Sequence, residues 1–190
     1  MTHRYRWRVA VLLQWFVALM TGLGGSFVPT MAGAQPAANT HIAAGLVAEG
    51  PAAPGGTVML AITMRPDPGW HGYWQNPGDA GFGMKLDWNL PAGATAGAPL
   101  YPVPRTLVIA GLMNHVYEEA YAVLVPLRLP AGAAPGSRLD VTVQADWLAC
   151  TDQVCVPERA RLGTVVSITA PGVPAAHDPR FEQWRARLPA

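Results

Sequence analysis

Two cysteines, Cys150 and Cys155, carry the clearest potential for chemistry in this sequence. They are the only cysteines of the chain and lie in the segment WLACTDQVCVPE, residues 147–158. Thiols at this spacing can form an intrachain disulfide, exchange that disulfide with a partner, or bind a soft metal ion. Three chemistries therefore have to be compared: redox exchange, a structural crosslink and metal binding.

A structural crosslink would add little to this chain. Closing a loop of about six residues contributes roughly 2 kcal/mol on the chain-entropy model. A chain of this length can bury a sufficient core without that help. Short disulfide loops also tend to be strained, which raises the reduction potential and makes the bond labile. These considerations favour a redox pair, while a structural crosslink remains an alternative.

Metal binding is the second alternative. The two thiolates, together with His71 or His115 and with Met113, include ligands for Cu(I) or Zn(II). Structural zinc sites usually have four ligands in closely spaced pairs, whereas here only the two cysteines are close in the sequence. We therefore expect no metal site and no cofactor, and copper binding stays open as an alternative function.

The spacing of the cysteines also limits the mechanism. In thioredoxin-like proteins a Cys-x-x-Cys pair lies at a helix N-terminus, which lowers the pKa of one thiol. The segment around Cys150 predicts no helix and contains no lysine, so we expect no strongly activated thiolate. Such a pair suits exchange with a partner whose own thiol is activated, through a mixed disulfide that the second cysteine resolves. Asp152 and Glu158 are candidates for assisting proton movement, although a solvated carboxylate is the commoner case.

The elements that hold the cysteines are predicted to be strands. In residues 141–147 the odd positions are apolar and the even positions polar, which is the period of a β-strand. Segments rich in proline and glycine, such as residues 54–56, 66–69 and 135–137, predict turns. The predicted strands are Ile42–Glu49, Thr57–Met64, Trp70–Trp74, Met84–Leu90, Arg105–Ile109, Ala120–Leu129, Arg138–Trp147 and Ala160–Thr169. This spacing predicts an all-β, immunoglobulin-like antiparallel β-sandwich, with the cysteines at a strand–loop–strand junction.

The C-terminal segment departs from the strand pattern. Residues 178–188 predict a short helix that begins with Asp178 as its N-cap. Its apolar face consists of Phe181, Trp184 and Leu188. We therefore predict an immunoglobulin-like domain over residues 35–173 and a tail with a short C-terminal helix over residues 174–190.

The first residues predict an export signal rather than part of the fold. Basic residues precede an apolar stretch from Val9 to about Val28, and residues 32–34, Ala-Gly-Ala, have the small-x-small pattern of a cleavage site. We predict a signal peptide over residues 1–34, cleaved after Ala34, and a periplasmic location. An uncleaved anchor is the alternative, since the apolar stretch is almost long enough to span a bilayer. The exported part has no basic patch, which argues against nucleic-acid binding.

Three motifs, in this order along the chain, resemble one known family. They are residues 70–81 (WHGYWQNPGDAG), residues 86–91 (LDWNLP) and residues 145–158 (ADWLACTDQVCVPE). The family is the N-terminal periplasmic domain of the DsbD/ScsB thiol:disulfide interchange proteins, also called the disulfide bond corrector domain. The resemblance extends over about residues 42–169.

The resemblance implies a fold and a function. In this family the domain is an immunoglobulin-like sandwich whose cysteine pair takes electrons from a thioredoxin-like domain, itself fed by a membrane-embedded domain. The pair passes them to periplasmic acceptors such as disulfide isomerases or cytochrome c maturation factors, and the ScsB branch is linked to copper tolerance. Carried over, Cys150 and Cys155 are the catalytic pair of a protein-disulfide reductase type activity. The expected partners are thioredoxin-like periplasmic proteins and a membrane electron-carrier protein.

In this family a loop also caps the disulfide and moves aside for a partner. The segment Gly111–Tyr117 falls where that loop is expected, and His115 and Tyr117 are its candidate cap residues. For Tyr117, an ordinary strand aromatic packed in the core is the alternative. The aromatic motif at residues 70–79 is expected to pack and to fix strand register rather than to contact a partner.

The sequence departs from the family in two respects. The better-studied members have one more residue between the cysteines, which affects the geometry of the loop and its reduction potential. The sequence also contains neither the membrane domain nor the thioredoxin-like domain. We therefore expect either an exported relay that uses separate partners or a truncated gene product.

Overall fold

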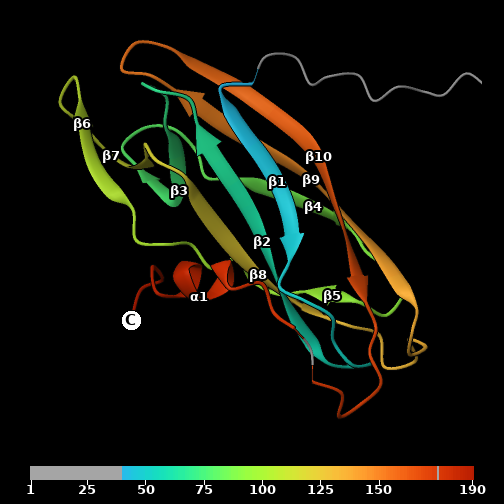
Figure 1. Cartoon of the computed structure of the whole chain (residues 1–190). Coiled ribbons are helices and arrows are strands. Elements are labelled where there is room, and N and C mark those ends of the chain that lie inside the picture. The colour runs from blue at the N-terminus through green and yellow to red at the C-terminus, as the bar shows by residue number, and fades with distance from the viewer. Residues whose placement is uncertain (1–39, 175) are drawn as a thin grey trace, which may run out of the picture. The chain divides into compact units, whose positions relative to one another are not determined.

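The computed structural model describes residues 40–174 and 176–190, and the predicted signal peptide, residues 1–34, lies outside them. The described chain forms ten β-strands and one α-helix (Figure 1). They are β1 (Ile42–Ala48), β2 (Thr57–Pro66), β3 (Gly72–Gly78), β4 (Lys85–Asn89), β5 (Thr95–Ala96), β6 (Arg105–Ile109), β7 (Leu112–Tyr117), β8 (Tyr121–Arg128), β9 (Arg138–Cys150), β10 (Cys155–Ser167) and α1 (Arg180–Arg185). In this part of the chain no helix is both long and apolar enough to cross a membrane.

The strands form three hydrogen-bonded sheets with antiparallel pairing. The first sheet has the order β1-β2-β8-β5, the second β10-β9-β4 and the third β3-β7-β6. The main core lies between the first two sheets, since Leu60 and Val125 of the first pack in one cluster with Val143 and Val166 of the second. The predicted all-β, immunoglobulin-like sandwich with a short C-terminal helix is therefore confirmed.

The hairpin of β9 and β10 positions the cysteines. Its register runs without a break from Arg138 opposite Ser167 to Cys150 opposite Cys155. From position 141 to position 147 of β9 the odd residues are buried and the even ones partly buried, as the alternation predicts. Because side chains alternate between faces, a slip by one residue would turn the buried face outward. The core pattern of β9 therefore fixes where the two cysteines meet.

Two strands, β5 and β7, were not predicted. A loop is predicted over Gly111–Tyr117, which is wrong, because most of this segment is β7, paired with β6 and β3. The turn between β6 and β7 consists of Ala110 and Gly111, whose φ angles of 49° and 85° are those of a two-residue type I′ hairpin. Alanine rarely adopts a positive φ, so the residue types at this turn do not signal a hairpin.

Other elements differ from the prediction at their ends. β9 continues to Cys150 and β10 begins at Cys155, so that only residues 151–154 form the hairpin tip. The helix is shorter than predicted. The N-cap is Pro179 rather than the predicted Asp178. The Asp178 carboxylate, one residue earlier, accepts a hydrogen bond from the backbone N–H of Arg180 at 3.0 Å.

The helix α1 covers the outer face of the first sheet. Phe181 is fully buried against β2 and β8, where it contacts a cluster that includes Ala61 and Leu124. These two residues alternate along their strands with residues of the main core, so they face away from it. Trp184 and Leu188 pack on the same cluster, which confirms the predicted apolar face of the helix.

A buried carboxylate fastens β1 to the cysteine hairpin. Glu158 accepts hydrogen bonds from the backbone N–H groups of His41 and Ile42 and, at 2.9 Å, from the indole of Trp147. The expectation of a solvated carboxylate is wrong for this residue. The reason is that residue 158 lies within β10, directly opposite Trp147 of β9, and so shares the inward face of Trp147.

Replacing Glu158 by alanine should lower the free energy of unfolding by about 3 kcal/mol, because it leaves the Trp147 indole and the β1 backbone without their acceptor. Urea unfolding of the oxidised protein measures this change. Asp152→Ala is the matched control, since Asp152 is an exposed carboxylate of the same hairpin. A change within about 0.5 kcal/mol is expected for the control. Equal effects of the two substitutions would show that Glu158 does not fasten β1.

Candidate functional site

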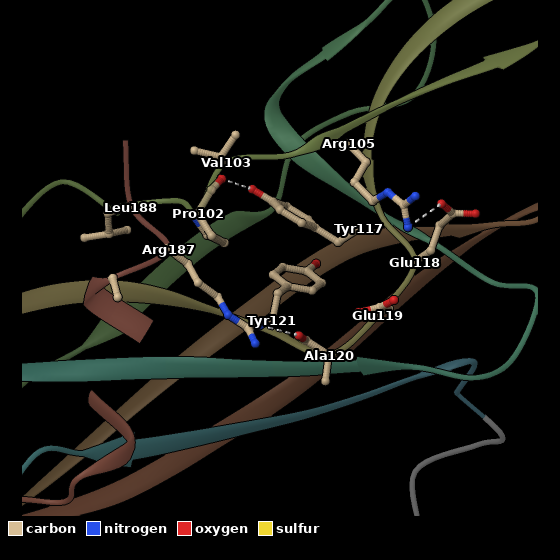
Figure 2. Close-up of a pocket in the computed structure, with 11 residues that line it drawn as sticks. Pro102, Val103, Arg105, Tyr117, Glu118, Glu119, Ala120, Tyr121, Arg187 and Leu188 are labelled. Carbon is tan, nitrogen blue, oxygen red and sulfur yellow. Dashed lines mark hydrogen bonds and ion pairs between the residues drawn. The ribbon is translucent and has the colours of Figure 1, made fainter. Parts of the chain in front are cut away.

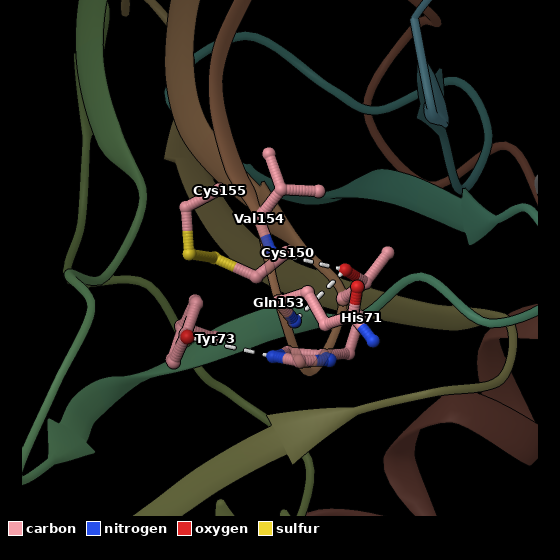
Figure 3. Close-up of a disulfide and its surroundings, with 7 residues drawn as sticks. His71, Tyr73, Cys150, Gln153, Val154 and Cys155 are labelled. Atoms are coloured by element: carbon pink, nitrogen blue, oxygen red, sulfur yellow. Dashed lines mark hydrogen bonds between the residues drawn. A yellow bond between two sulfur atoms is a disulfide. The ribbon is translucent and has the colours of Figure 1, made fainter.

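The disulfide between Cys150 and Cys155 closes the tip of the β9–β10 hairpin (Figure 3). The two residues lie directly opposite each other, with their Cα atoms 4.1 Å apart. Within the tip, the backbone N–H of Thr151 donates to the carbonyl of Val154 at 2.8 Å. The Thr151 hydroxyl accepts the N–H groups of Gln153 and Val154, each at 3.1 Å. The disulfide thus lies at the end of two long strands, next to a hydrogen-bonded turn.

The two cysteines differ in their exposure to solvent. Cys150 has no exposed surface, whereas Cys155 is exposed. Cys150 belongs to a small buried cluster with Tyr73, Val116 and Leu148. Exchange begins when a thiolate reaches one sulfur of a disulfide, so its rate depends on which sulfur is accessible. Since Cys150 is fully covered, Cys155 is the cysteine at which this geometry allows an attack.

His71 lies beside Cys150, in the segment that leads into β3. The two residues form an antiparallel bridge in which each backbone N–H donates to the carbonyl of the other, at 2.8 and 3.0 Å. Residues paired in this way project their side chains from the same face. The imidazole is only 3% exposed, and its Nε2 lies 3.4 Å from the hydroxyl oxygen of Tyr73. Figure 3 shows the imidazole and the Tyr73 ring on the same side of the disulfide.

Burial favours the neutral form of both side chains. It lowers the pKa of the His71 imidazole below its ordinary value, while the negative charge of Glu118 acts in the opposite direction. It also raises the pKa of the Tyr73 hydroxyl. At neutral pH the disulfide is therefore flanked by a neutral imidazole and a neutral phenol. Either group can take part in a proton transfer, and neither adds a charge to the buried cluster.

Sequence reasoning missed the pair formed by His71 and Tyr73. His71 is predicted there only as a candidate metal ligand, and residues 70–79 as a packing motif. The packing prediction is confirmed for Trp70 and Trp74, which lie against the main core. The available signal was the period of the strand, because residues 71 and 73 share one face and residues 70 and 74 the other. The sequence does not show that one face packs on the main core and the other on the Cys150 cluster. That arrangement depends on the pairing with β9, which is distant in the chain.

The turn after β3 folds back over Tyr73. Gly81 has a φ of 84°, and a Cβ atom at this position would lie 2.4 Å from the Tyr73 ring. Any other residue would therefore be strained here and would displace the ring. Asp79 holds the same turn on β7, since its carboxylate accepts the N–H of Met113 at 2.8 Å. The Asn-Pro-Gly-Asp-Ala-Gly segment thus positions a side chain of the disulfide cluster.

The candidate cap residue Tyr117 is a core aromatic in the structure. Its ring stacks on Tyr121 with the centroids 4.0 Å apart, and its hydroxyl donates to the carbonyl of Pro102 at 2.6 Å. Both rings line a groove with a volume of about 400 Å³. Residues of the β7–β8 turn and of the C-terminal tail line it as well (Figure 2). These contacts are those of the packed strand aromatic that stood as the alternative for Tyr117.

The other cap candidate, His115, fastens an irregular part of β3. Its Nδ1 lies 3.1 Å from the carbonyl oxygen of Asn76. The pairing is irregular here, because the four residues 74–77 of β3 lie opposite the single residue His115 of β7. The β6–β7 hairpin reaches the disulfide cluster through other residues: Val116 belongs to it, and Leu107 packs against it. A cap role for the two candidate residues stays a prediction.

The geometry also bears on the alternatives to exchange. β9 and β10 are paired along their whole length, so the disulfide closes a turn that the backbone pairing already forms. The hairpin is therefore held by its backbone hydrogen bonds, and the disulfide is an additional crosslink at its end. Within residues 40–174 and 176–190, no three side chains of the His, Cys, Asp and Glu types lie together as metal ligands.

His71 should make the folded protein less stable at acid pH. Its pKa is lower in the folded protein than the ordinary value of 6.5, which applies to the unfolded chain. Its contribution to stability is therefore complete above pH 6.5 and falls as the pH is lowered from there toward the folded pKa. The melting temperature of the wild type should accordingly drop more steeply with acidification than that of His71→Gln. His177→Gln, at an exposed position, should retain the wild-type dependence; parallel curves for all three proteins would contradict this account.

Three comparisons place the chain among known proteins. The family model described as thiol:disulfide interchange protein DsbD, N-terminal, matches residues 43–167. The N-terminal periplasmic domain of ScsB from Proteus mirabilis has a TM-score of 0.58 at 19% identity, over 80% of this chain and 56% of that chain. The DsbD N-terminal domain from Neisseria meningitidis, in the reduced form, has a TM-score of 0.37 at 16% identity, over 70% of this chain and 89% of that chain. No curated protein matches the chain.

The two kinds of comparison support different statements. At 19% identity the likeness to the ScsB domain concerns the fold alone, and the chain spans 56% of the length of that structure. The family model, by contrast, covers nearly all of the segment from β1 to β10 and includes both cysteines and His71. The chain therefore belongs to the family of DsbD N-terminal domains of thiol:disulfide interchange proteins.

Proposed function

We propose that the protein is a periplasmic thiol–disulfide exchange module that passes reducing equivalents between thioredoxin-fold partners through Cys150 and Cys155. The observation that carries the proposal is the asymmetric disulfide at the hairpin tip, with Cys155 exposed and Cys150 buried. A disulfide with one accessible sulfur has a defined point of attack, and the second cysteine is held in place to resolve a mixed disulfide. Membership of the DsbD N-terminal family supports the same reaction.

Electrons enter when a partner thiolate attacks the sulfur of Cys155. The bond between the two cysteines breaks, Cys150 leaves and takes up a proton, and a second partner thiol then releases Cys155. Electrons leave by the reverse sequence, in which Cys155 attacks a partner disulfide and Cys150 resolves the mixed disulfide. The activity is of the protein-disulfide reductase type and needs an external electron donor. A thioredoxin-like protein fed by a membrane electron carrier fits that requirement.

The partner supplies the activation in this scheme. Cys150 and Cys155 lie at the ends of strands, and the side chains next to Cys150, His71 and Tyr73, are neutral at neutral pH. Among residues 40–174 and 176–190 the cysteines thus lie at strand ends beside neutral side chains, whereas in thioredoxin-fold proteins a helix dipole or a nearby positive charge stabilises the thiolate. Exchange is then fast with partners that bring a low-pKa thiol and slow with ordinary thiols, which gives the module its selectivity.

The β6–β7 hairpin is the element that we propose as the cover of this site. Leu107 is partly buried and packs against the cluster that contains Cys150, whereas its neighbour Val108 is 64% exposed on the other face of the strand. Leu107 thus extends the apolar wall on the Cys150 side of the disulfide. The cap candidates His115 and Tyr117 would act by holding this hairpin in place, through Asn76 and the main core respectively.

Single cysteine variants test the proposed exchange. Cys150→Ser leaves the exposed thiol of Cys155 and should accumulate a mixed disulfide with a thioredoxin-like protein, because no second thiol resolves it. Cys155→Ser leaves the buried thiol and should accumulate much less. Non-reducing electrophoresis and mass spectrometry of the linked peptides measure both products. Equal trapping would contradict the asymmetry of the site, and no trapping with either variant would contradict the exchange function.

Shortening the proposed cover should open the Cys150 side of the disulfide to small reductants, which in the wild type reach only the exposed Cys155. Leu107→Ala removes most of the side chain that packs against the cluster, so dithiothreitol should reduce the oxidised protein several-fold faster. Val108→Ala is the matched control, because it shortens an exposed side chain of the same strand, and its reduction rate should equal that of the wild type. The rate is followed by alkylation of the released thiols. Equal rates for the two variants would show that Leu107 does not cover the site.

A further inference from the structure

The proposed exchange contains a step for which the buried cysteine needs help. To resolve a mixed disulfide on Cys155, the thiol of Cys150 must lose its proton and become a nucleophile. A thiol in water ionises near pH 8.5, and apolar surroundings favour its protonated form. Cys150 has no exposed surface and lies at the end of a strand rather than at a helix N-terminus. A base inside the protein would remove this obstacle.

We propose that His71 is this base, and that it accepts the proton of the Cys150 thiol as Cys150 attacks a mixed disulfide on Cys155. This inference rests on the proposed function and adds a catalytic residue to it. The backbone bridge between His71 and Cys150 places their side chains next to each other on one face, and both are buried. Neighbours in such a pair have Cβ atoms about 5 Å apart, which brings an imidazole within reach of a thiol.

The step balances in electrons and protons. The sulfur of Cys150 uses its electron pair to form the bond to the sulfur of Cys155. The bond between Cys155 and the partner sulfur breaks, and the partner leaves as a thiolate with that electron pair. The thiol proton passes to His71, which returns it to water or to the departing thiolate. The dithiol of the protein is thereby oxidised to the disulfide, and the disulfide of the partner is reduced.

The titratable groups around His71 fit this role. The Tyr73 hydroxyl lies 3.4 Å from Nε2 and orients the ring, and burial raises its pKa so that it stays protonated. Burial lowers the pKa of His71, so the imidazole is in its basic form at neutral pH, while the Glu118 carboxylate favours the imidazolium that forms. Glu118 is itself exposed and lies 4.0 Å from Arg105. The buried carboxylate of Glu158 is already engaged by β1 and an indole.

Stopped-flow reaction of the reduced protein with dithiobis(nitrobenzoate) separates the two steps of exchange. Cys155 first takes up one thionitrobenzoate in a bimolecular reaction, and Cys150 then displaces it in a first-order reaction. Each step releases one coloured anion. In the wild type the first-order rate should be nearly independent of pH in the range between the pKa of the imidazole and the pKa of the thiol. In His71→Gln it should be about 100-fold slower at neutral pH and should rise with hydroxide concentration.

Two further variants and one equilibrium measurement separate proton transfer from packing. His177→Gln replaces an exposed imidazole and should keep the rate and pH profile of the wild type. Glu118→Gln changes an exposed residue and should slow the first-order step by a smaller factor, because it removes the charge that favours the imidazolium. The reduction potential of the pair should be unchanged in His71→Gln, since a base speeds the forward and reverse reactions equally.

The possible outcomes are distinct. A first-order rate in His71→Gln equal to that of the wild type, or one that is slower with an unchanged pH profile, would overturn the assignment of His71 as the base. A change in reduction potential large enough to account for the slower rate would also overturn it. Failure of the wild type to release the second thionitrobenzoate would show instead that the two cysteines do not exchange, and the proposed function would be lost with the inference.

Discussion

The backbone pairing at the end of β9 is the constraint on which the site depends. Cys150 is paired on one side with Cys155 of β10 and on the other with His71, in the segment before β3. The first pairing places the Cys155 sulfur next to the Cys150 sulfur. The second places the His71 side chain beside the buried Cys150. Both follow from the register of β9, and that register is held by residues such as Val141 and Val143 in the main core. The hydrophobic pattern that forms the sandwich therefore also brings the two cysteines together.

Residues 70–74, which lead into and begin β3, contact two clusters at once, because successive residues of an extended chain point to opposite faces. Trp70 and Trp74 lie against the main core, while the residues between them, His71 and Tyr73, lie beside the disulfide. The turn that follows β3 then covers the Tyr73 ring at Gly81, where a Cβ atom has no room. The aromatic motif at residues 70–79 thus packs on the main core with one face and contributes side chains to the surroundings of the disulfide with the other.

Neutral groups around a buried cysteine have a chemical consequence. A fixed positive charge beside Cys150 would raise the fraction of its thiolate but lower the intrinsic nucleophilicity of that thiolate, since nucleophilicity falls with pKa. A neutral imidazole such as His71 can accept a proton during the reaction without stabilising the thiolate beforehand. Cys155 is exposed, so its thiol can release its proton to water and needs no base inside the protein. The asymmetry in burial thus matches the different tasks of the two sulfurs in the proposed relay.

The sequence by itself determined the local features. The strand period, the glycine and proline turns, the apolar face of the C-terminal helix and the cysteine hairpin are encoded over a few residues, and each was predicted. Tertiary structure alone decided the burial of Glu158, the difference in exposure between Cys150 and Cys155, and the neighbour of Cys150. His71 and Leu107 reach the cysteines from strands that are distant in the chain, and no local pattern records which strands become neighbours. That choice is made when the sheets pack and each strand buries its apolar face.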